Sequence, residues 1–183
     1  MLKIVLPGAS PHGAGFEVPL DMLAACHLRV ADQCATLQRL VPHLMQHGAD
    51  ERARSAAARV LRYIDTAARD HHADEEVDLF PALIESMAGS DAVCLHEITA
   101  ALTAEHRQLE AHWLRVRTAL QAIVDADADA RVSLDAELVH PFVDLYARHI
   151  AREETELLPM AARLLCDAEL DRIGRAMRQR RGV

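Results

Sequence analysis

Two stretches of the chain repeat one pattern: residues 71–81 read HHADEEVDLFP, and residues 149–159 read HIAREETELLP. Both follow the form H-x-x-x-E-E-x-x-L-x-P. In an α-helix, residues four apart lie on the same face, about one turn from each other. If each stretch is helical, its histidine and first glutamate point the same way. The two predicted pairs are His71 with Glu75 and His149 with Glu153.

The sequence around these stretches has the period of bundle helices. Apolar residues recur at alternating spacings of three and four, the pattern of a helix with one buried face. Pro81 lies within one such segment and should kink or restart the helix, because it lacks an N–H and crowds the preceding turn. Four long helices with short connections predict an all-α, antiparallel up-down-up-down four-helix bundle. The four segments are 19–46, 50–88, 91–124 and 133–165.

The composition agrees with one helical domain. Hydrophobic residues make up 51% and charged residues 26% of 183 residues, as in ordinary globular chains. Aromatic residues are only 3%, whereas alanine and leucine, both strong helix formers, are abundant. We expect a proline- and glycine-rich arm at 1–18, the bundle at 19–166, and a short basic helix or tail at 167–183.

Charge and hydropathy exclude some partners. A net charge of −8 repels phosphate backbones, so we expect no nucleic-acid binding. No stretch approaches the roughly 18 apolar residues of a membrane helix, and no secretory signal is visible. The cysteines are far apart, without a C-x-x-C pair, which favours a reduced, cytoplasmic compartment. The arm could pack across its own bundle or onto a second subunit, so a homodimer stays open.

The eleven histidines point to a metal. Each expected helix places one histidine on its inward stripe: His27, His71, His106 and His149. A single one is readily explained as a hydrogen-bonded core residue. Four imidazoles and two carboxylates in one apolar core need a cation as partner. Imidazole and carboxylate ligands together favour iron, manganese or zinc over calcium or magnesium.

These residues resemble the hemerythrin-like (HHE cation-binding) proteins over residues 19–166. The resemblance rests on a lone His27, HHADEE in the second helix, AEH at 104–106 and HIAREE in the fourth helix. Ferritin-like di-iron bundles use the opposite order, Glu-x-x-His. The resemblance implies a non-haem centre of two iron ions, with zinc or manganese as other possible metals. The implied terminal ligands are His27, His71, His106 and His149, and the implied bridges are Glu75 and Glu153.

The chain departs from the oxygen-carrying members in two places. Those proteins have two histidines four apart in the third helix, whereas Leu102 and Glu110 flank His106 here. They also place the fourth-helix carboxylate five residues after its histidine, at Glu154, while the spacing of four at Glu153 resembles the sensor and iron–sulfur-repair branches. Fewer histidines leave more open metal positions. The resemblance thus favours sensing or binding of O2 or NO, or iron handling, over reversible oxygen carriage.

We therefore expect a metal-binding protein rather than an enzyme. The alternative is a di-iron oxidase or peroxidase, or an enzyme of NO detoxification or iron–sulfur repair, which would need an open metal position and a substrate pocket. A metal-free phosphotransfer module fits less well, because its histidine must be exposed. The C-terminal arginines read as a solvated helix end that complements the helix dipole. The sequence leaves open the roles of Cys26, His72, Glu76, Glu105, Glu110 and Glu154.

Overall fold

A computed structural model describes residues 15–86, 91–127 and 130–183, so most of the expected arm lies outside the described residues. Two long helices are continuous: α1 (Pro19–His47) and α5 (Asp91–Val124). The second arm of the bundle is composite: α2 (Glu51–Tyr63), the π-helical turn η1 (Ile64–Ala68), α3 (Arg69–Ala73), the π-helical turn η2 (Asp74–Leu79) and α4 (Phe80–Ser86). The fourth arm comprises α6 (Ala136–Arg152), the π-helical turn η3 (Glu153–Leu157) and α7 (Leu158–Leu164), and α8 (Asp167–Arg180) follows. These residues contain no strand, which confirms the predicted all-α class.

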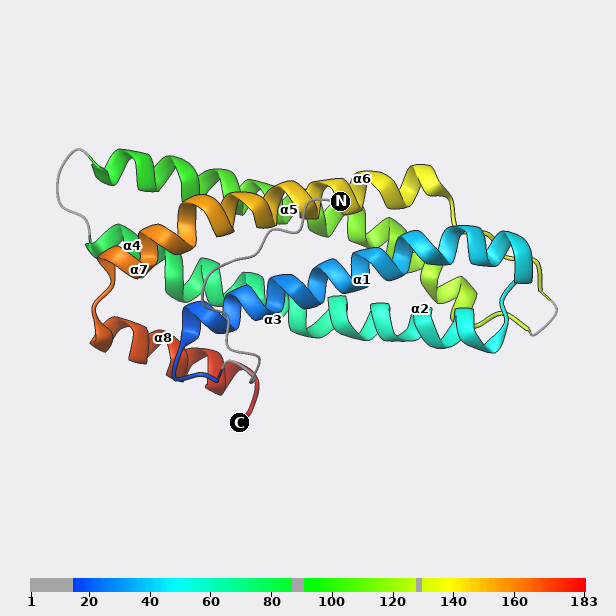
Figure 1. Ribbon diagram of the computed structural model, residues 1–183, viewed down its shortest axis with the longest axis horizontal. Coiled ribbons are helices and arrows are strands. Elements are labelled where there is room, and N and C mark those ends of the chain that lie inside the picture. The colour runs from blue at the N-terminus through cyan, green and yellow to red at the C-terminus, as the bar shows by residue number, and fades with distance from the viewer. Residues whose placement is uncertain (1–14, 87–90, 128–129) are drawn as a thin grey trace.

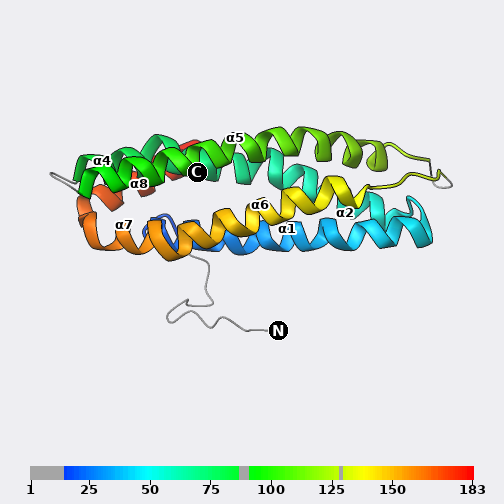
Figure 2. The same ribbon diagram turned by 90° about the horizontal axis from the view of Figure 1, so that it is seen from above.

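The four arms form an elongated bundle (Figures 1 and 2). Helix α1 packs against α2 and α6, and α5 packs against the same two helices, so the arms form a closed ring. Figure 1 shows the chain reversing at alternate ends of the long axis. Gly48 ends α1 with a φ of 65°, a conformation that glycine adopts without strain. Asp50 then caps α2, because its side chain accepts a hydrogen bond from the Ala53 N–H at 2.8 Å.

The core consists of two apolar clusters with a polar layer between them. One cluster includes Val30 of α1 and Leu109 of α5, and the other includes Leu23 and Leu102 of the same helices. On every arm the expected metal-binding positions fall between the residues of the two clusters. Apolar packing therefore holds the bundle together on both sides of the polar layer.

The widened turns η2 and η3 lie at the repeated motif. The N–H of Phe80 donates to the carbonyl of Glu75, and the N–H of Leu158 donates to the carbonyl of Glu153, each five residues back. The helical path continues through Pro81, where the sequence suggested a kink or restart, because the π-helical turn just before the proline absorbs the irregularity. Turns of this kind occur often at functional sites.

Helix α8 crosses one end of the bundle and packs on α1 and η2 (Figure 1). Its Gly174 lies against the backbone of Phe16, where a Cβ atom would meet the Phe16 carbonyl oxygen. None of the described helices is long and apolar enough to cross a membrane.

Candidate metal centre

The structure brings the six predicted ligands together in the polar layer. Helices α1 and α5 each supply one histidine, and the two composite arms supply the residues of the repeated motif. All are buried, with at most 2% of the side chain exposed, and they comprise His27, His71, Glu75, His106, His149 and Glu153. They form two groups that share both glutamates. The first group adds His27 and His71, and the second adds His106 and His149.

Glu153 presents one carboxylate oxygen to each group. Its Oε2 lies 2.9 Å from Nε2 of His27, and its Oε1 lies 3.0 Å from Nε2 of His149. The spacing of four residues within the motif places His149 and Glu153 on one face, as the sequence predicts. A carboxylate that faces two groups of nitrogen donors in this way is placed to bridge two ions.

Glu75 occupies the equivalent position in the other copy of the motif. Its Oε1 lies 3.5 Å from Nε2 of His71, and its Oε2 lies 3.4 Å from Nε2 of His106. The Nε2 atoms of His106 and His149 are 3.0 Å apart. Two ligand atoms at right angles, each about 2.1 Å from one ion, lie about 3 Å apart. These spacings therefore fit two ions that share the two carboxylates.

A second set of carboxylates fixes the orientation of three histidines. Nδ1 of His27 lies 2.6 Å from Oε1 of Glu154, and Nδ1 of His106 lies 2.7 Å from Oε1 of Glu76. Nδ1 of His149 lies 2.9 Å from Oε2 of Glu105. A carboxylate only accepts, so each Nδ1 carries the hydrogen and each Nε2 keeps its lone pair for the centre. Pairs of this kind orient metal-bound histidines and raise their basicity.

The atoms that face the centre lack partners of their own. Among the described residues, both oxygens of Glu75 and of Glu153 are buried without a hydrogen bond, and so is Nε2 of His27. Nε2 of His27 lies near Glu153 but is not aligned with it as a donor. Buried acceptors that converge without a donor are costly. Cations would remove that cost, so the residues present fit a metal centre.

Without cations, protons take up part of this strain. Burial and the neighbouring Glu153 carboxylate raise the pKa of Glu75 well above its usual range. Burial alone would disfavour the charged imidazole of His27, but Glu153 and Glu154 raise its pKa to about 10. Burial lowers the pKa of His71. The metal-free cluster therefore holds protons that incoming cations would displace.

His72, left open by the sequence, belongs to this region. It is buried, and one of its nitrogens lies within 4.8 Å of ligand atoms of His106 and His149. Its ring stacks on that of His106, with centroids 4.0 Å apart and an interplanar angle of 15°. Imidazole lone pairs lie in the ring plane, so two nearly parallel rings do not direct them at one point. His72 thus lies beside the cluster and lines its border.

Glu110 lies elsewhere: it is exposed and pairs with Arg107 at 3.0 Å. Cys26 is a buried thiol next to His27. His112 and His140 are also outside the two groups.

A buried ion-pair cluster behind Glu75 was missed by the sequence interpretation. Asp74 is completely buried and accepts from Arg180 and from Arg181, whose Nη2 lies 2.6 Å from Asp74 Oδ2. Arg180 also contacts Asp78 at 2.7 Å. These two arginines are therefore anchored in the bundle, not solvated as expected. Asp74 stands three residues after His71, a helical neighbour position that could have revealed its inward direction.

The comparisons with known proteins agree with this geometry. Residues 18–161 match the model of the hemerythrin HHE cation-binding domain. A protein of uncharacterised function from Haemophilus influenzae is 32% identical over 170 residues, which cover 93% of this chain and 94% of that protein. The chain therefore belongs to the hemerythrin HHE cation-binding family, and its histidine–glutamate groups are of a kind that can hold metal ions.

Proposed function

We propose that this protein binds two iron ions in the centre of its bundle. His27 and His71 would hold one ion, His106 and His149 the other, and the two glutamates would bridge them. The observation that carries the proposal is the convergence of four buried carboxylate oxygens, without donors, on histidines whose Nδ1 hydrogens point away. Imidazole and carboxylate together suit iron, with manganese and zinc as the competing metals.

The iron pair would supply redox chemistry and bind small diatomic molecules. We propose a binding or sensing role toward O2 or NO, or a role in iron handling, in the cytoplasm. The protein contributes a buried, nitrogen-rich site between two apolar clusters, which limits access of water. A second candidate is a redox enzyme, favoured by the cavity beside His72 described below.

Metal analysis of protein reconstituted with Fe(II) without oxygen, then desalted, tests the proposal. We expect two iron ions per chain in the wild type. Glu75→Ala and Glu153→Ala should each lose most of the iron because each removes a bridge, and both should still fold because the apolar clusters remain. His112→Ala and His140→Ala are the controls and should keep two ions. Full iron in the glutamate variants, or iron loss in the controls, would show that the assignment is wrong.

A further inference from the structure

A cavity of about 520 Å³ opens beside the polar layer, between η1 and α3 on one side and α5 and α6 on the other. Its walls include Ala68, Leu109, Trp113 and Tyr146, and His72 also lines it. This size and apolar lining are typical of sites for organic molecules. A diatomic gas needs far less room, since a cavity of about 150 Å³ already holds benzene.

The charged groups at the rim are already paired. Nε1 of Trp113 donates to Oδ1 of Asp65 at 2.8 Å, and Nε of Arg117 contacts Oδ2 of the same carboxylate at 2.9 Å. Glu110, also at the rim, pairs with Arg107. The indole is thereby fixed in the wall. Because these ions satisfy each other, the cavity favours an uncharged, flat molecule over an ion.

His72 supplies the polar point of this cavity. Only 8% of its surface is exposed, and its Nε2 is buried without a hydrogen-bond partner among the described residues. Its ring stacks on His106, so one imidazole separates the cavity from the candidate metal centre. A buried nitrogen without a partner gains a hydrogen bond when a suitable group arrives.

We propose that this cavity binds a small, flat aromatic molecule carrying one hydroxyl group, with the hydroxyl at His72. The bound molecule would lie next to the histidines of the metal centre as a substrate or effector. The proposal extends the proposed function, but binding itself needs only the cavity, so the two can fail separately.

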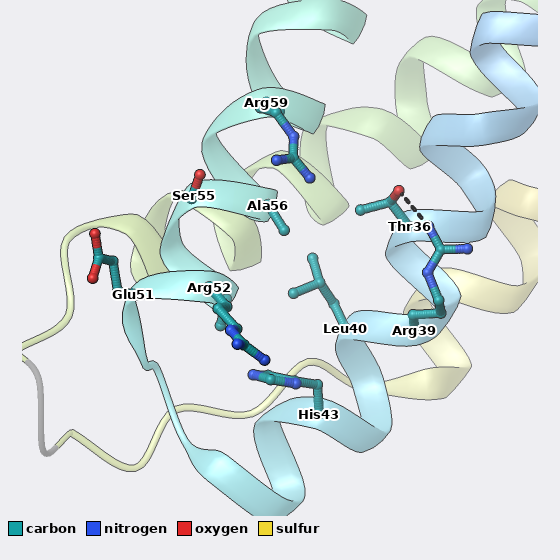
Figure 3. A pocket seen from close by; sticks show the side chains of 10 residues that line it. Thr36, Arg39, Leu40, His43, Glu51, Arg52, Ser55, Ala56 and Arg59 are labelled. Carbon is teal, nitrogen blue, oxygen red and sulfur yellow. Dashed lines mark hydrogen bonds between the residues drawn. The ribbon is translucent and has the colours of Figure 1, made fainter.

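The other large cavity offers a contrast. It lies between α1 and α2, has a volume of about 570 Å³, and is lined by Arg39, Arg52 and Arg59 (Figure 3). Ala56 lies in its wall, much as Ala68 lies in the wall of the first cavity. A leucine at either alanine adds the same volume to one cavity only, which provides a matched pair of variants.

The test uses 2-naphthol and naphthalene as probes on metal-free and zinc-loaded full-length protein. Trp113 is the only tryptophan in the chain, so quenching of its fluorescence reports directly on the cavity. We expect saturable binding of one 2-naphthol per chain in both forms, about three- to tenfold tighter than naphthalene because of the hydrogen bond to His72. Ala68→Leu should weaken binding by about tenfold or more, while Ala56→Leu should not change it.

His72→Phe keeps the ring and removes the nitrogens. It should bind both probes equally and retain two metal ions per chain. If Ala68→Leu does not fold, Leu114→Asp at the exposed rim should weaken 2-naphthol binding by about threefold through lost apolar contact. Absence of saturable quenching, equal effects of the two leucine variants, or an unchanged preference for 2-naphthol in His72→Phe would each overturn the proposal. Metal loss in His72→Phe would make His72 a ligand and remove it from the cavity. Probe binding by a protein that takes up no metal would leave this inference standing and refute the proposed function.

Discussion

Removal of the arginines that hold Asp74 should cost more stability than removal of Asp74 itself. In Arg180→Ala/Arg181→Ala the Asp74 carboxylate stays completely buried and loses both partners. Breaking a buried pair from one side typically costs about 3–5 kcal/mol, because an uncompensated charge remains inside. We therefore expect the free energy of unfolding to fall by about that amount in the double variant.

Asp74→Ala leaves a different situation. The side chains of Arg180 and Arg181 are 19% and 17% exposed near the end of the chain, so they can turn toward water. Arg180 also keeps Asp78 as a partner. We expect a loss of about 1–2 kcal/mol, the usual cost of hydrogen bonds to a charged group. The triple variant should then resemble Asp74→Ala and be more stable than the double variant.

Urea unfolding followed by circular dichroism, with chelator present to fix the metal state, measures these differences. Arg175→Ala is the control, because Arg175 is exposed on the same helix and should change stability by less than about 0.5 kcal/mol. The reasoning is refuted if Asp74→Ala is at least as destabilising as the double arginine variant, or if adding Asp74→Ala to that variant restores nothing.

Three further outcomes are expected. Chelation of the metal should lower the thermal midpoint without unfolding the protein at room temperature, since a ligand present at 100 times its Kd adds about 2.7 kcal/mol; an unchanged midpoint in calorimetry would contradict this. Glu154→Gln should weaken metal binding about 10- to 100-fold in a chelator competition, because His27 loses the carboxylate at its Nδ1. At pH 8 a disulfide reagent should titrate two thiols, those of the exposed Cys94 and Cys166, and the other two only after unfolding. Burial raises the pKa of Cys26, and that of Cys34 to about 12, so both stay protonated; four fast thiols would count against the packing described.

The helices were predictable because their cause is local. The stripes of leucine and alanine fix which face of each helix is buried, and the ends of α5 coincide with the predicted segment 91–124. The repeated motif likewise predicts which side chains meet, since a spacing of four residues decides direction on a helix. Their clustering follows from this spacing, while their role as iron ligands stays a prediction.

Other features depend on contacts between distant parts of the chain. Glu105 reaches His149 from another helix, and no local pattern distinguishes it from an ordinary surface glutamate. The anchoring of Arg181 on Asp74 requires α8 to fold back over η2, which the sequence does not specify. The cavity beside His72 arises from side chains of three separate arms and has no linear signature.

The π-helical turns have a consequence for how such a chain can change over time. Each residue advances a helix by about 100°, because one turn holds about 3.6 residues. Deleting a single residue from η2 after Glu75 would leave the spacing of His71 and Glu75 intact but rotate everything downstream, so that Leu79 and Leu83 would leave the apolar cluster they now fill. Substitutions in this turn can be absorbed one at a time, whereas insertions and deletions cannot. The number of residues from metal-binding carboxylate to core leucine is thus fixed more strictly than their identity.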